Sequence, residues 1–195
     1  MAALAIVSIL TLAGFSMIRS SRSHARQAAT DLLESMIEQA RVTAITSRSQ
    51  VILAIVEPRN FTAHDTQYRL GIVKVESWPE DGVITGTLLN RWKNLETGVV
   101  LIGGEVNGLQ NLLDSKPIEI ECSNIKIKRM MVHAIAFNSR GGLQYPPGSA
   151  PLVVCITEGS HRNGRPVPDH RANANTATKN EIKICRVSSR CYRLN

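Results

Sequence analysis

The chain opens with a long run of apolar positions. No charged side chain lies between Met1 and Ile18, and three arginines follow closely, at Arg19, Arg22 and Arg26. At about 1.5 Å per residue, a helix over this run covers most of a hydrocarbon core roughly 30 Å thick. The pattern predicts a transmembrane, polymerising half-helix over residues 1–24. A cleavable secretory signal and a buried core helix are the alternatives, but the run lacks a basic start and is uniformly apolar.

The helical period continues beyond this run with a different composition. Apolar residues recur three and four positions apart from Ala25 to Ile45, charged residues fall on the opposite side, and residues 19–46 contain neither Pro nor Gly. The pattern predicts an amphipathic half over residues 25–47, continuous with the first, in a helix of about 45 residues, roughly 70 Å long. The apolar face expected to pack on a sheet consists of Leu32, Leu33, Met36, Ile37 and Ala40.

Strand patterns dominate the rest of the chain. Runs rich in β-branched residues, or alternating between apolar and polar, occupy 51–56, 68–75, 99–102, 118–122, 131–137, 152–157, 182–187 and 191–194. Ser188-Ser189 predicts the turn of a final hairpin, and residues 159–180 read as a long polar loop. We therefore expect an α+β fold, in which the long N-terminal helix packs on a mostly antiparallel sheet within a β-rich head domain over 48–195.

Basic residues concentrate at the C-terminal end. The formal net charge is +7, and from Gly159 to Asn195 basic residues outnumber acidic ones by eight to two. Such a segment fits nucleic acid, an anionic surface or an acidic partner, and is also common in solvated faces.

The four cysteines leave two interpretations open. Their number is even, so disulfides are possible in an oxidising compartment, with three complete pairings that spacing does not distinguish. Four half-buried thiols are equally compatible with the spacing, which is not typical of a metal or redox motif. These residues are Cys122, Cys155, Cys185 and Cys191.

A membrane-anchored metal-dependent or hydrolytic enzyme is the main alternative from another functional class. His161, Asp169 and His170 share the long loop and could meet Cys155 or Cys185 at a metal. No histidine pair has the i,i+4 spacing of a helical zinc motif, and no Gly-x-Ser-x-Gly nucleophile is present. We therefore expect no catalytic residue, no cofactor and no resident metal, and a protein that is not an enzyme.

One stretch carries a family resemblance. Residues 28–56 (AATDLLESMIEQARVTAITSRSQVILAIV) resemble the segment of GspH/FimT-like minor pseudopilins in which a helix with an Ala-Arg-x-x-Ala pattern leads through a polar turn into a Val-rich strand. Trp92, Leu95 and Gly98-Val99 resemble a later family motif, although Glu96 stands where the family has Pro. A narrower similarity is to prepilin-like proteins of verrucomicrobial gene cassettes.

The resemblance implies a structural role. It predicts a minor pilin or pseudopilin subunit of a type II secretion or type IV pilus-like filament, with other subunits, the inner-membrane assembly machinery and membrane lipid as partners. It places the protein in the bacterial inner membrane as a single-pass protein, with the head in the periplasm or at the cell surface. The assembly residues are then Leu4, Ile6, Val7, Ile9, Leu10, Leu12, Phe15 and Ile18.

The start of the chain departs from the family. Prepilins carry a short basic leader and a Glu at the fifth mature position, and neither precedes Ala2. The arginines after the apolar run would also hold the C-terminal side in the cytoplasm, opposite to pilin topology. Both observations favour the hypothesis that Met1 is an internal codon with leader-encoding sequence upstream.

A DNA-uptake role is the alternative within the same family. Some members bind DNA through a basic C-terminal motif, which Arg190, Tyr192 and Arg193 resemble with wider spacing and no Gly. Arginines near an aromatic ring can hold phosphate beside a stacked base. A hairpin edge protected by charge is the competing interpretation.

Overall fold

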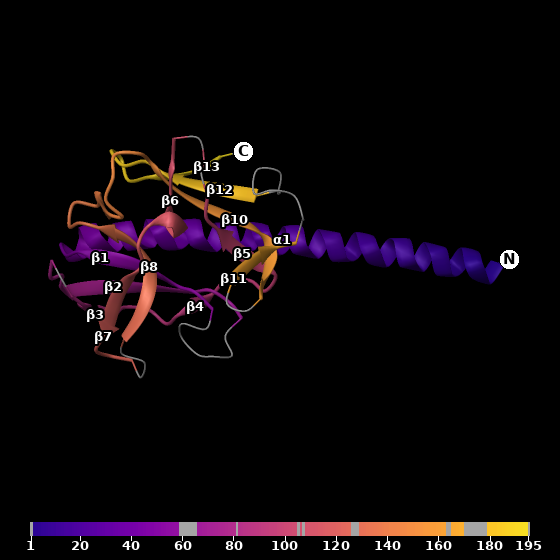
Figure 1. The fold of residues 1–195 in the computed structure, drawn as a ribbon, viewed down its shortest axis with the longest axis horizontal. Coiled ribbons are helices and arrows are strands. Elements are labelled where there is room, and N and C mark those ends of the chain that lie inside the picture. The colour runs from indigo at the N-terminus through magenta and orange to yellow at the C-terminus, as the bar shows by residue number, and fades with distance from the viewer. Residues whose placement is uncertain are drawn as a thin grey trace.

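The structure is a computed structural model that describes residues 2–58, 66–80, 82–104, 106, 108–125, 129–162, 165–169 and 179–194, with side chains from residue 23 onward. Within these residues there is one α-helix, α1 (Ala2–Ser47), which runs along the head and continues beyond it toward the N-terminus (Figure 1).

The C-terminal half of α1 is amphipathic, as the spacing predicts. Its fully buried apolar residues, three and four positions apart, form one stripe: Ala29, Leu33, Met36, Ile37, Ala40 and Ala44. The predicted contact residue Leu32 is partly buried against the same core. The helix ends after Ser47, where Arg48 adopts a left-handed φ of 49° and the Ser49 amide donates to the Ala44 carbonyl.

Five strands close into a small barrel. They are β1 (Val51–Val56), β2 (Arg69–Ser77), β3 (Ile84–Leu88), β7 (Ile118–Cys122) and β8 (Arg129–Phe137). Each pairs with the next, and β1 also pairs with β8, which completes the ring. All these pairings are antiparallel except that of β3 with β7, which is parallel. Two short strands extend the ring, β4 (Lys93–Asn94) on β2 and β9 (Leu143–Tyr145) on β8.

A second sheet is built around the long strand β10 (Leu152–Arg162). On it pair β5 (Val99–Ile102), β6 (Gln110–Asn111), β11 (Arg165–Pro168) and β12 (Lys179–Ile184). The sheet ends with β13 (Cys191–Leu194), which pairs with β12 as the predicted final hairpin. A short 3-10 helix, η1 (Leu112–Asp114), follows β6 and is capped by the Asn111 side chain.

The helix lies between the two sheets. One core joins the buried stripe of α1 to apolar residues of β1, β2 and β8 on one side and of β5, β10 and β12 on the other (Figure 1). A separate apolar cluster fills the inside of the barrel. β1 belongs to both, because Val51, Leu53 and Ile55 face the helix while Ile52, Ala54 and Val56 face the barrel interior.

The predicted architecture, a long helix packed on one mostly antiparallel sheet, is therefore wrong. The head contains a closed five-stranded barrel and a second sheet, and α1 contributes residues 23–47 to the packing between them. The long loop predicted over 159–180 is also wrong in its first part, because β10 continues to Arg162 and β11 follows.

The membrane predictions are corrected as well. Among the helical residues that the structure describes, no segment combines the length and the apolar character that crossing a membrane requires. This finding overturns the transmembrane assignment of residues 1–24, the single-pass localisation in the bacterial inner membrane, and the description of the fold as pilin-like and led by such a helix.

Candidate functional site

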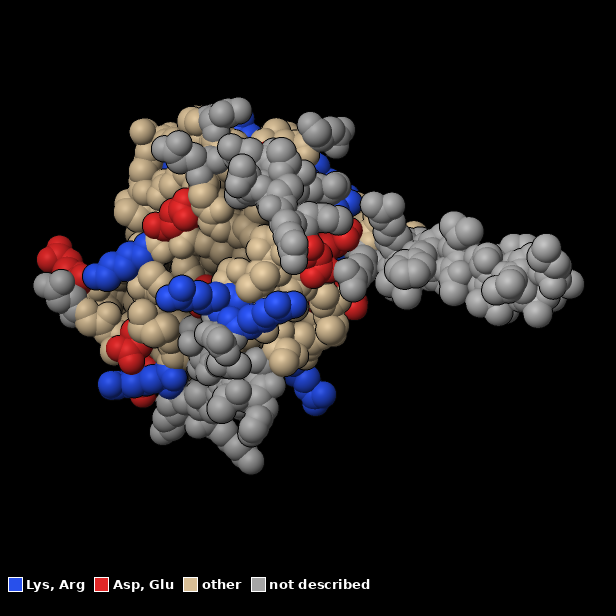
Figure 2. All heavy atoms as spheres, turned by 45° about the vertical axis from the view of Figure 1, so that its right-hand side comes forward, with Lys and Arg blue, Asp and Glu red and all other residues tan. Residues whose placement is uncertain are grey.

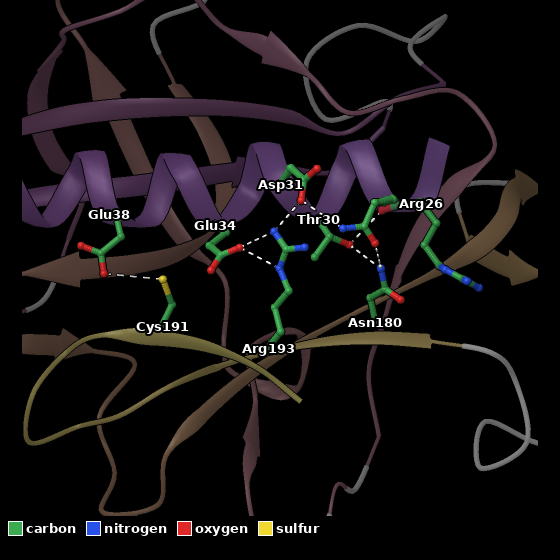
Figure 3. A network of polar contacts seen from close by, with 9 residues as sticks. Arg26, Thr30, Asp31, Glu34, Glu38, Asn180, Cys191 and Arg193 are labelled. Atoms are coloured by element: carbon green, nitrogen blue, oxygen red, sulfur yellow. Dashed lines mark hydrogen bonds and ion pairs between the residues drawn. The ribbon is translucent and has the colours of Figure 1, made fainter. Parts of the chain in front are cut away.

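A network of polar contacts joins the C-terminal hairpin to α1 (Figure 3). Arg193 on β13 projects toward the helix, where its Nε donates to Glu34 Oε2 at 2.8 Å. Its Nη2 forms further ion pairs with Glu34 and with Asp31. Asp31 and Glu34 lie three positions apart on one helix face, so a single guanidinium reaches both. Their carboxylates, Glu34 first, raise the pKa of Arg193 above its ordinary value.

The same hairpin makes two more contacts with the helix. The Cys191 thiol lies 3.5 Å from Glu38 Oε1, one turn further along α1. Burial, together with the nearby Glu38 carboxylate, raises the pKa of Cys191 to about 12. On β12, Asn180 Nδ2 donates to Thr30 Oγ1 at 2.9 Å. We call these contacts, with those of Arg193, the helix–hairpin clamp.

A buried ion pair extends this side of the helix to β10. Arg26 Nη1 lies 3.2 Å from Glu158 Oε1, and both side chains are largely buried. Such a pair adds little to the free energy of folding, because desolvation of both charges offsets much of their attraction. Its main effect is to hold the two side chains in one relative position. Arg26 and the clamp thus hold α1 in one position on the second sheet.

A second polar cluster lies where the barrel meets the second sheet. His133 Nε2 on β8 lies 3.2 Å from Glu57 Oε1, directly after β1. A hydrogen bond from His133 lowers the pKa of Glu57. Nearby, the Tyr68 hydroxyl lies 3.2 Å from His161 Nε2 on β10. Burial, and then the Glu57 charge, raises the pKa of Tyr68.

This cluster does not have the arrangement of a hydrolytic centre. His133 Nδ1 is buried and has no hydrogen-bond partner among the described residues. The high pKa of Tyr68 disfavours its ionisation, so it is a poor acid–base group near neutral pH. The structure brings no Ser or Cys nucleophile to these histidines in any hydrogen bond that it describes.

The four cysteines are free thiols in the structure, so none of the disulfides that their number allows is formed. Burial raises the pKa of Cys122 and of Cys155 to about 11 in each case. Cys185 differs, because hydrogen bonds from the Ser188 backbone and hydroxyl lower its pKa.

The metal-site alternative gains no support from the described chain. His161 contacts Tyr68, and His170 lies outside the described residues. Over the described ranges, no three His, Cys, Asp or Glu side chains are close enough together to hold a metal ion.

The residues considered for DNA binding do not form one surface, because Arg193 and Tyr192 lie on opposite faces of β13. All three are exposed, but Arg193 is paired with carboxylates of α1, whereas no such pair with α1 is found for Arg190 or Tyr192 among the described contacts. Basic side chains also gather near the middle of one face of the head (Figure 2). Arg162 on β10 and Arg165 on β11 are both exposed and lie directly opposite each other in the sheet.

The predicted assembly residues lie outside the side chains that the structure describes. They are Leu4, Ile6, Val7, Ile9, Leu10, Leu12, Phe15 and Ile18.

The helix–hairpin clamp was missed by sequence reasoning. Its signal is present, however: Asp31, Glu34 and Glu38 follow helical spacing, and Cys191 and Arg193 follow strand spacing. What the sequence does not show is that these two rows face each other.

Comparison of the chain with models of protein families, with characterised proteins and with solved structures finds no significant match.

Proposed function

We propose that this chain is a structural subunit that assembles with other subunits into a filament through the part of α1 that extends beyond the head. The minor pilin or pseudopilin role implied by the sequence resemblance is the specific form of this proposal. The observation that supports it is the division of α1: residues 23–47 pack inside the head, and the helix continues away from the head to Ala2 (Figure 1).

A projecting helix of this composition favours assembly. The sequence from Ala2 to Ile18 contains no charged residue. Burying apolar surface contributes roughly 25 cal/mol per Å², and an isolated helical segment is marginal in water without packing partners. The same segment of neighbouring subunits is a suitable partner, because equivalent contacts can then repeat along a fibre.

The clamp gives this helix a firm connection to the head. Arg193 binds Asp31 and Glu34, and Arg26 binds Glu158, so the head is attached to α1 on its polar side as well as through the core. A force applied to the projecting half would therefore act on the whole head. A subunit in a fibre needs this property, whereas a freely hinged head would not transmit load.

The nucleic-acid alternative is less well supported by the geometry. Of the residues considered for it, Arg193 already forms ion pairs with two carboxylates. Binding phosphate with this guanidinium would require breaking the clamp. Arg190 remains exposed but is one cation, which adds little to a salt-dependent affinity.

The test is assembly of the purified full chain, followed by sedimentation velocity and electron microscopy as concentration rises. We expect oligomers or fibres from the natural sequence. Leu10→Lys should shift the chain to monomers, because it places a charge in the apolar contact. The matched control is Ser35→Lys, at an exposed position of the same helix within the head.

Two results would contradict the proposal. One is a natural chain that stays monomeric at all concentrations. The other is equal loss of assembly in both lysine variants, which would point to a general effect of added charge and not to contacts at the projecting segment.

A further inference from the structure

The second sheet ends in an edge strand close to the C-terminus. β13 is the terminal strand of this sheet, and within the described chain its one hydrogen-bonded neighbour is β12. The Cys185 amide donates to the Arg190 carbonyl. In an antiparallel pair, every second residue of a strand forms such hydrogen bonds with its partner, so this bond shows which residues of β13 bond to β12. The backbone groups of Tyr192 and Leu194 then point toward β12, and those of Cys191 and Arg193 point outward.

β13 has four residues, and a short strand is one protection of a sheet edge, but other protections are missing from it. Edges are commonly blocked by proline, by a bulge or by a charged side chain that projects over them. β13 contains no proline, and its pairing with β12 is regular. The charged side chain of Arg193 is turned back to α1 by the clamp. Within the part of the chain that the structure describes, the outward backbone groups of Cys191 and Arg193 have no strand partner.

Exposed apolar side chains accompany this edge. Among the described residues, seven large apolar side chains are exposed, and three of them lie on this hairpin: Val187 at 96%, Tyr192 at 51% and Leu194 at 36%. Tyr192 and Leu194 share one face of β13, opposite to Arg193, because side chains alternate along a strand. A strand added at this edge would cover them.

The charge around these side chains selects the kind of partner. Lys183 is the cross-strand neighbour of Tyr192 and shares its face, as does Arg190 by alternation. Glu181, on the same face, is neutralised by Lys179 at 2.7 Å. The surface is therefore positive. It favours acidic side chains in the partner and disfavours β13 of a second copy, which would bring the same cations.

The hairpin is held in position before any partner binds. Arg186 donates from Nε to the Ala150 carbonyl at 2.7 Å and from Nη2 to Gln110 Oε1 at 2.7 Å. Ser189 Oγ accepts from the Leu143 amide at 2.8 Å. A fixed edge loses little conformational entropy on binding, which favours affinity.

We infer that β13 binds an extended segment of a partner protein by strand addition, and that this segment carries both apolar and acidic residues at every second position, on the face that it shares with Tyr192, Leu194 and the nearby cations. Main-chain hydrogen bonds to Cys191 and Arg193 supply affinity, and contacts with Tyr192, Leu194 and the nearby cations supply specificity. The inference concerns the head alone and does not depend on assembly through α1.

The experiment measures binding of a fluorescent peptide of about seven residues, with glutamate and valine in turn at every second position and threonine between them, by anisotropy with the full chain. We expect saturable binding, and binding at least about tenfold weaker for a peptide with lysine in place of glutamate. Cys191→Pro removes an outward amide and should abolish binding, whereas Cys191→Ala loses the same thiol but keeps the amide and should bind normally. Proline is tolerated at an edge where the amide faces solvent.

A second variant keeps the test decisive if Cys191→Pro does not fold. Arg190→Glu should weaken the glutamate peptide and strengthen the lysine peptide. The inference is overturned if no peptide binds, if folded Cys191→Pro binds as well as Cys191→Ala, or if both peptides bind equally. It is also overturned if Cys191→Pro abolishes a dimer that Cys191→Ala retains, because the occupant is then a second copy.

Discussion

Arg193 Nε lies 2.8 Å from Glu34 Oε2, although 159 positions separate the two residues in the sequence. The contact joins the last described strand to the helix at the start of the chain. Because Glu34 and Asp31 share one guanidinium, the contact is a small network and not an isolated surface pair.

Replacing Arg193 should weaken the head modestly. The groups are partly exposed, so solvent screens them, and Arg193→Ala is expected to lower the free energy of unfolding by about 1 kcal/mol or less. Urea unfolding measures this, with Arg190→Ala as an exposed control of the same residue type. In about 1 M salt the difference between Arg193→Ala and the natural chain should shrink. A difference that does not respond to salt would count against an electrostatic origin.

Glu57 should make stability depend on pH in the acid range. Its pKa is lowered from the usual 4.5 by the hydrogen bond from His133. The stabilisation is therefore present above pH 4.5 and is lost as the pH falls through the lower, folded-state pKa. Unfolding free energies of the natural chain and of Glu57→Gln should differ above this range and converge below it. Parallel curves at all pH values would exclude this linkage.

Gly71 should not accept a side chain. A Cβ at this position on β2 would lie 2.5 Å from Trp92 Cζ3 and 2.9 Å from Leu88 Cδ1. Gly71→Ala is therefore expected to cost about 1–3 kcal/mol of stability through overpacking. Denaturant unfolding measures the loss, and Trp92→Leu combined with Gly71→Ala should recover part of it relative to the sum of the single changes. Simple additivity would show that the ring does not cause the strain.

One thiol should react well before the others. Hydrogen bonds from Ser188 lower the pKa of Cys185, whereas burial and Glu38 raise that of Cys191 to about 12. A lower pKa increases the thiolate fraction at about pH 7.5, and the thiolate is the reactive form. With an aromatic disulfide reagent, the native chain should show one fast thiol, which Cys185→Ser removes. A fast phase that survives in this variant would contradict the assignment.

Several elements could be predicted from local pattern, for identifiable reasons. The β-branched run Val51–Val56 is β1 to the residue, and Val99–Ile102 is β5, because continuous apolar runs bounded by turn residues leave little choice. The sequence does not predict β3, because Gly86 and two threonines leave it with few of the apolar residues that indicate a strand. Its parallel pairing with β7 depends on contacts distant in sequence, so no local pattern indicates it.

The barrel closure and the clamp could not be predicted for a related reason. Closure requires β1 to pair with both β2 and β8, and alternation along β1 does not reveal a second neighbour. The clamp requires β13 to face the acidic side of α1, which follows only from the arrangement of the second sheet. In both cases the residues were visible in the sequence and their relative placement was not.

β1 has a consequence for how the head comes apart. Both of its faces are buried, one under α1 and the other inside the barrel. Unfolding of either the helix or the barrel would expose one apolar face of β1 to water. The two should therefore unfold in one transition. Thermal denaturation followed at once by helical circular dichroism and by tryptophan fluorescence should therefore give coincident transitions for the head.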